Sequence, residues 1–171
     1  MRSEWIDKSE VEHILAALTT ENRLACLISL ATGLRLNDVL AIKTEQARKG
    51  RFTIREQKTG KTRLVRLPVP LQQAALCIAG QHYVFENRLD GKKHRTRQAV
   101  FKDLRRAAVL FRVKEHITPH SMRKIYAVEE YAKHGDLKRV QRLLNHSDEA
   151  VTMLYAMANC VRKNTKSRKK K

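Results

Sequence analysis

The sequence predicts a mainly α-helical domain with one small antiparallel β-sheet. Along most of the chain, apolar residues recur at intervals of three and four, the spacing of one helix face. Only residues 51–67 alternate apolar with polar residues, as a strand with one buried face does. At 171 residues the chain has the length of one ordinary domain, and it can bury a core without disulfides or a structural metal.

Three helices and a hairpin are predicted for the first half of the chain. The first helix begins at the capping-box sequence of residues 7–10. Its apolar face consists of Val11, Ile14, Leu15 and Leu18. A second helix over 21–31 stops at Gly33, which suits a C-terminal cap, and a third begins near Leu36 and extends to include Ile42. Strands at 51–55 and 62–67 then form a basic hairpin around the turn 58–61.

The second half is predicted to be helical apart from a short extended piece at 83–85. After two prolines end the hairpin, a helix is expected at 71–78 and an amphipathic one from Arg97 to about Leu110. Pro119 fits the first turn of the next helix, which ends at His134-Gly135. Asp136 caps a short helix through Leu144, and a final helix begins near Asp148.

The charge of the chain indicates a polyanionic partner. Lys and Arg total 36 against 17 acidic residues, a formal net charge of +19, and DNA, RNA or an anionic membrane surface could balance such an excess. No stretch approaches the ~20 apolar residues of a membrane span, and the first five residues lack the apolar core of a signal peptide. We therefore expect a soluble, cytoplasmic protein without a membrane partner.

The sequence divides into one domain at 1–161 and a basic tail at 162–171. The tail carries seven Lys and Arg residues and no apolar one, so it has nothing to offset the entropy of ordering. It is expected to be a disordered arm that adds salt-sensitive affinity for phosphates, although a merely solubilising tail fits equally well.

The densest group of candidate functional residues is the run 118–123. His120 and Arg123 are three positions apart, so they share a face near a helix N-terminus, where backbone N–H groups favour an anion. An arginine fork can hold two phosphate oxygens. By itself, however, a His-x-x-Arg motif is more often part of a solvated face than of a phosphate site.

Five elements in order give this motif a context. They are Thr32-Gly33-Leu34-Arg35 within the run 31–40, the hairpin turn with Lys58, His120-x-x-Arg123, the run Leu143-Leu144-Asn145-His146-Ser147, and Tyr155. In this order they resemble the tyrosine recombinase family, which includes the phage integrases. The resemblance covers about residues 9–158 and implies the fold of that family's catalytic domain.

The resemblance implies a role for each of six residues. Arg35 and Arg123 would grip the scissile phosphate, Lys58 would be the hairpin lysine, and Tyr155 would be the nucleophile. His120 and His146 would be the two histidines of the site. The implied activity is site-specific DNA recombination, as by an integrase, through a 3′-phosphotyrosyl intermediate.

Chemistry supports these roles. Charge builds up on the nonbridging oxygens during phosphoryl transfer, and two guanidiniums with histidine donors can stabilise it without a metal. Tyrosine ionises near pH ~10, so His120 is the natural proton acceptor, while Lys58 could protonate the leaving 5′-oxygen. Because the phosphotyrosyl link preserves the bond energy, rejoining would require neither ATP nor any cofactor or metal.

Alternatives remain at three levels. Lys61 lies in the same turn as Lys58 and could be the hairpin lysine, although the pattern Gln57-Lys58-Thr59-Gly60 favours Lys58. Tyr126 and Tyr131, on the His120 helix, are alternative candidates for the nucleophile. The same tyrosine chemistry would also serve a type IB topoisomerase that relaxes DNA. A non-catalytic basic DNA-binding protein is the non-enzymatic alternative.

Double-stranded DNA is the expected partner. Further DNA contacts are assigned to basic residues of the hairpin, of two helices and of the tail, namely Lys61, Arg63, Arg97, Lys124, Lys163 and Lys166. The resemblance implies a tetramer on synapsed DNA, and we expect a monomer without DNA. It also implies a bacterial or phage origin on a mobile element. The family usually carries an N-terminal DNA-binding domain before the catalytic one, so we expect this chain to be either a fragment of a longer protein or a minimal stand-alone member.

Overall fold

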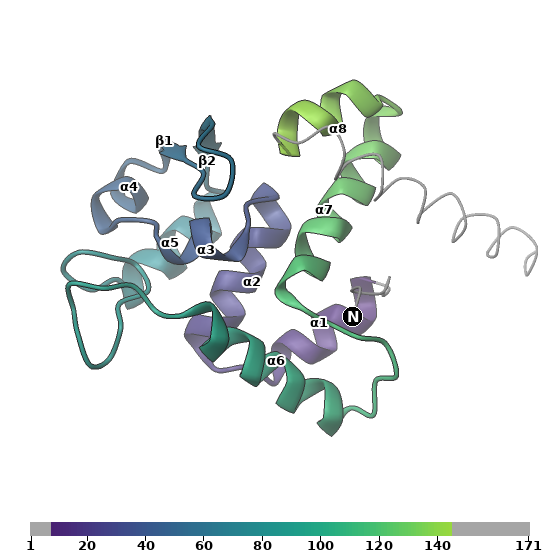
Figure 1. Cartoon of the computed structure of the whole chain (residues 1–171), viewed down its shortest axis with the longest axis horizontal. Coiled ribbons are helices and arrows are strands. Elements are labelled where there is room, and N and C mark those ends of the chain that lie inside the picture. The colour runs from purple at the N-terminus through teal and green to yellow at the C-terminus, as the bar shows by residue number, and fades with distance from the viewer. Residues whose placement is uncertain (1–7, 145–171) are drawn as a thin grey trace, which may run out of the picture.

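Helices α2 and α7 run side by side through the middle of the protein, and the remaining elements lie around them (Figure 1). The computed structural model describes residues 8–144. The elements in chain order are α1 (Lys8–Ala16), α2 (Thr20–Thr32), α3 (Leu36–Leu40), α4 (Thr44–Lys49), β1 (Arg51–Arg55), β2 (Thr62–Arg66), α5 (Val69–Ile78), α6 (Arg97–Leu110), α7 (Pro119–His134) and α8 (Leu137–Leu144). The predicted fold class, mainly α with a small antiparallel sheet, is confirmed.

One hydrophobic core joins most of these elements. The buried side chains of α2 include Leu24, Ala25 and Ile28, and they share this core with Met122 and Ile125 of α7. Both helices have an apolar stripe, as their sequence periodicity predicts. Burial of the two stripes fixes the relative position of the ends of α2 and α7, from which the candidate site is built.

The hairpin packs one face of its two strands against the core. Arg51 pairs with Arg66 and Arg55 with Thr62 across the antiparallel ladder. Phe52 and Ile54 of β1 point inward, whereas Leu64 of β2 points outward and is 56% exposed. The inward positions follow the period of two that the sequence predicts.

Three local predictions differ from the structure. The third helix ends at Leu40, so Ile42 lies beyond it, and the short helix α4 was not expected because six residues show too little periodicity. Helix α5 begins at Val69 rather than at 71, because a proline is tolerated in the first helical turn. In the predicted extended piece, Tyr83 forms only an isolated bridge with Lys43.

Two predicted segments, the final helix from Asp148 and the tail 162–171, lie outside the described residues. Within residues 8–144, no helix is long and apolar enough to cross a membrane.

A buried carboxylate fixes the start of α2. Asp103 of α6 accepts hydrogen bonds from Thr19 N (2.9 Å) and from Asn22 Nδ2 (2.8 Å). Arg106 donates to its other oxygen at 2.7 Å. Burial by itself would raise the pKa of Asp103, but the hydrogen bonds from Asn22, Thr19 and Arg106 outweigh it and lower the pKa. The charged form is therefore favoured in the folded protein.

We expect Asp103→Asn to lower the free energy of unfolding by about 2 kcal/mol near neutral pH, because hydrogen bonds to a charged group are lost. The lowered pKa means that this stabilisation is complete above the ordinary value of 3.8 and is lost as the pH falls through the folded-state value. Urea denaturation at several pH values measures it. A difference between wild type and variant that does not shrink in acid would contradict this assignment.

Candidate active site

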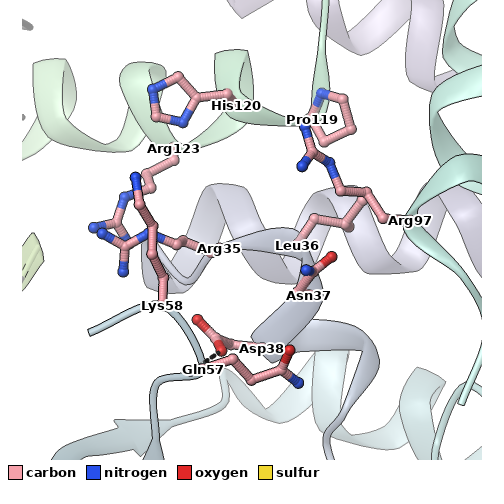
Figure 2. A pocket seen from close by; sticks show the side chains of 10 residues that line it. All are labelled: Arg35, Leu36, Asn37, Asp38, Gln57, Lys58, Arg97, Pro119, His120 and Arg123. Carbon is pink, nitrogen blue, oxygen red and sulfur yellow. Dashed lines mark hydrogen bonds between the residues drawn. The ribbon is translucent and has the colours of Figure 1, made fainter. Parts of the chain in front are cut away.

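A cavity of about 570 Å³ opens between the α2–α3 turn, the hairpin turn, α6 and the start of α7. Its lining consists of Arg35, Leu36, Asn37, Asp38, Gln57, Lys58, Arg97, Pro119, His120 and Arg123. In Figure 2 the side chains of Arg35, Lys58 and Arg123 gather at one end of the cavity, with His120 beside them. Arg97 enters from the opposite side, from α6. The lining is thus dominated by cationic side chains from separate parts of the chain.

Gly33 makes the turn that delivers Arg35. Helix α2 ends at Thr32, and Gly33 takes the left-handed conformation with φ of +66°. A Cβ atom at this position would collide with the ring of Tyr126, which packs against it from α7. Glycine therefore satisfies both the backbone conformation and the close approach of α7. Two residues later, Arg35 is the extended residue that precedes α3.

The Arg35 guanidinium is held by a buried carboxylate. Its Nη1 atom donates to Glu56 Oε2 at 2.7 Å, and the side chain of Glu56 is fully buried. A carboxylate leaves water only with compensating charge or hydrogen bonds. The ion pair thus fixes the arginine and neutralises part of the positive charge beside the cavity.

The turn that carries Lys58 is fastened to α3. Gln57 N donates to Asp38 Oδ1 at 2.9 Å, a bond that Figure 2 shows as a dashed line. Burial raises the pKa of Asp38 and the negative charge of Glu56 raises it further, whereas the hydrogen bond from Gln57 lowers it. Lys58 itself is exposed to solvent at the cavity mouth.

Helix α7 brings His120 and Arg123 to the cavity from its first turn. Thr118 caps this helix by accepting from His120 N at 3.2 Å, and Pro119 occupies the first helical turn, as predicted. The side chain of Arg123 is almost fully buried. Its Nη1 donates to the carbonyl oxygen of Gly33 and its Nη2 to that of Leu144, each at 2.6 Å. Arg123 therefore ties the end of α2 to the end of α8.

The structure brings five of the predicted residues together, namely Arg35, Lys58, Arg97, His120 and Arg123. Of the other predicted DNA contacts, Lys61 is exposed on the hairpin turn and Lys124 is half-buried on α7. His146, Tyr155, Lys163 and Lys166 lie outside the described residues. The rival tyrosines, Tyr126 and Tyr131, are not among the described residues that line the cavity.

Arg63, a predicted DNA contact, is largely buried and does not line the cavity. Its side chain is only 11% exposed, with Nη1 3.9 Å from Glu56 Oε1. Its Nη2 donates to the carbonyl oxygen of Thr32. The guanidinium is thus turned into the protein, where Arg63 supports the end of α2.

The sequence analysis missed two buried carboxylates beside the cavity, Asp38 and Glu56. A signal for Glu56 was present, because it continues the inward positions of Phe52 and Ile54 by one more step of two. Arg63 lies two positions before the inward residue Val65, so the same alternation places it on the inward face of β2. Charged residues at inward positions of a strand predict a buried ion pair.

Comparison with known proteins agrees with the fold. The model of the phage integrase family matches residues 4–161. The tyrosine recombinase XerD of Rhizobium meliloti (strain 1021) is 33% identical over 165 residues, which cover 86% of this chain and 50% of that protein. The chain spans about half the length of the curated relatives it matches.

Solved structures share the same fold. The crystal structure of XerA recombinase has a TM-score of 0.70 at 18% identity and covers 96% of this chain and 66% of its own. The crystal structure of a lambda integrase tetramer bound to a Holliday junction has a TM-score of 0.72 at 20% identity. The match covers 90% of this chain and 48% of the lambda integrase chain. The fold is that of a tyrosine recombinase catalytic domain. The chain belongs to the phage integrase family.

The burial of Arg63 predicts a matched pair of results. Arg63→Ala removes a cation from buried Glu56 and is expected to lower the free energy of unfolding by about 2–3 kcal/mol. Lys61→Ala, two residues away but exposed, is expected to change it by less than about 0.5 kcal/mol. Chemical denaturation compares the two variants. Equal stabilities for Arg63→Ala and wild type would argue that the interior ion pair does not form.

Proposed function

We propose that this chain cleaves and rejoins DNA strands as the catalytic domain of a site-specific recombinase. The observation that carries the proposal is the meeting of Arg35, Lys58, His120 and Arg123 at one cavity. These residues come from three separate parts of the chain, and a cavity lined by so many cations is suited to a phosphodiester. Membership of the phage integrase family supports the same activity.

In the proposed reaction the two guanidiniums bind the nonbridging oxygens of the scissile phosphate. An arginine has five N–H donors, so the bonds of Arg123 to two carbonyl oxygens are compatible with a phosphate contact. The ion pair with Glu56 gives the Arg35 guanidinium a fixed direction. Because both groups are held before DNA binds, little reorganisation accompanies the build-up of charge in the transition state.

The covalent step exchanges one phosphate ester for another. The phenolic oxygen of Tyr155 forms a bond to phosphorus as the bond from phosphorus to the 5′-oxygen breaks. His120 accepts the proton of the phenol, and the Lys58 ammonium gives a proton to the leaving oxygen. The product is a 3′-phosphotyrosyl link with a free 5′-hydroxyl, and reversal of the same steps rejoins a strand without ATP or a metal.

Double-stranded DNA is the proposed substrate, and several protomers act together on it. A lambda integrase with this fold is a tetramer on a Holliday junction, which supports assembly on synapsed DNA. Lys61 and Arg97 are the described residues proposed to contact the DNA backbone beside the catalytic cations. Lys124, Lys163 and Lys166 are proposed as further contacts.

The salt dependence of binding tests these contacts. Each phosphate contact adds close to one unit to the slope of log affinity against log salt concentration. Lys61→Ala and Arg97→Ala are each expected to reduce this slope by about 1. Arg63→Ala, with a guanidinium turned inward, is expected to leave it unchanged. Fluorescence anisotropy with a labelled duplex measures the slopes, and a reduction confined to Arg63→Ala would contradict the assignment.

The decisive experiment on function is a search for a covalent protein–DNA adduct. The protein is incubated with supercoiled and nicked duplex DNA and denatured in detergent. The wild type is expected to retain DNA attached through a 3′-phosphate, and Tyr155→Phe is expected to lose the adduct because it has no phenolic oxygen.

Tyr131→Phe is the matched control, since this tyrosine is 38% exposed on α7 and away from the cavity. It should form the adduct at the wild-type rate. All three proteins should bind DNA with affinities within about twofold. An adduct that survives in Tyr155→Phe, or no adduct in the wild type on any substrate, would contradict the proposal.

A further inference from the structure

One oxygen atom links the two halves of the candidate site. Glu56 Oε2 accepts from Arg35 Nη1 at 2.7 Å and from the hydroxyl group of Thr59 at 2.9 Å. Arg35 belongs to the α2–α3 turn, whereas Thr59 follows Lys58 directly in the hairpin turn. The carboxylate therefore fixes a phosphate-binding arginine and the neighbour of the proposed proton donor at the same time.

Burial makes this arrangement rigid. The side chain of Glu56 has no exposed surface, and its second oxygen faces Arg63 Nη1 at 3.9 Å. A buried carboxylate strongly opposes any movement that removes its partners. The Thr59 hydroxyl is thus bound to a group that cannot turn toward water.

Backbone hydrogen bonds hold the base of the turn but not its tip. Glu56 N donates to Lys61 O at 2.9 Å, and Gly60 N donates to Glu56 O at 2.8 Å. Lys58 lies between these bonds and is exposed. Before Lys58 the backbone is held by the bond from Gln57 N to Asp38, and after it the Thr59 hydroxyl donates to Glu56. Thr59 therefore restrains the backbone that follows Lys58.

We propose that Glu56 and Thr59 are positioning residues. Glu56 orients the Arg35 guanidinium and, through the Thr59 hydroxyl, holds the turn so that the Lys58 ammonium reaches the leaving 5′-oxygen. This inference rests on the proposed function. It assigns no proton transfer to Glu56 or Thr59: the proton travels from Lys58 to the 5′-oxygen as the bond to phosphorus breaks.

A substrate whose leaving group needs no proton distinguishes a residue that positions Lys58 from a residue that only supports the fold. A thiol ionises near pH ~8.5, far below an alcohol, so a 5′-bridging sulfur at the cleavage site leaves without a general acid. A variant that only displaces Lys58 should recover on this substrate. A variant that disturbs the whole domain should remain slow on both.

The test compares Thr59→Val with wild type on oxygen and sulfur substrates in single-turnover cleavage. Valine keeps the shape of threonine and removes the hydroxyl. We expect cleavage of the oxygen substrate to slow by about 10- to 100-fold, part of the full effect of a general acid, and the sulfur substrate to be cleaved within about threefold of wild type. Thr62→Val, an exposed threonine at the start of β2, is the matched control and should cleave both substrates normally.

Glu56→Gln should affect both halves of the site. Loss of the charge weakens the hold on Arg35 as well as on Thr59, so the sulfur substrate should restore only part of the variant's cleavage rate. Normal cleavage of the oxygen substrate by Thr59→Val, or an equal loss on both substrates, would overturn the proposal.

Hydrogen exchange in the protein without DNA distinguishes failure of this inference from failure of the proposed function. In Thr59→Val the amides of Glu56 and Gly60 should exchange about fivefold faster, the factor expected for one lost hydrogen bond. In Thr62→Val they should not. If the wild type forms no adduct but exchange accelerates as expected, the proposed function fails while the anchoring of the turn stands. Unchanged exchange would overturn the anchoring even in an active enzyme.

Discussion

Cations that share one cavity repel one another, and the structure of this protein depends on how that repulsion is balanced. Among the described residues, buried acceptor groups balance this repulsion. The Glu56 carboxylate accepts from Arg35 and faces Arg63, while carbonyl oxygens of Gly33 and Leu144 accept from Arg123. In the low dielectric of the interior these interactions are strong enough to hold the guanidiniums close together. Buried groups of the protein itself therefore hold the cationic side chains of the cavity in place.

The same contacts explain the local architecture. Arg123 is buried like a core residue, yet its bonds join the end of α2 to the end of α8 across the first turns of α7. Gly33 lets α7 approach closely enough for this, because any side chain there would meet Tyr126. Replacement of one of these residues would disturb several helices at once, so the stability of the fold and the geometry of the site are coupled.

Much of the fold could be predicted because its signals are local. The helices α6 and α7 have long apolar stripes and clear caps, and their observed bounds agree with the predicted ones. The short helix α4 could not be predicted, because six residues give no usable periodicity. For the site, sequence order suggested residues that meet at one cavity, but it could not show which cations point inward. Arg63 illustrates this limit, since its ion pair with Glu56 depends on strand register rather than on composition.

The central claim is that Arg35, Arg123, His120 and Lys58 form one preorganised binding site for a scissile phosphodiester. A crystal structure of Tyr155→Phe with a duplex that the wild type cleaves would test it most directly. The account predicts a phosphate in the cavity, with both guanidiniums on its nonbridging oxygens, the Lys58 ammonium beside the 5′-oxygen, and Glu56 still bonded to Arg35. A duplex seated on another face, with the cavity empty of phosphate, would contradict it.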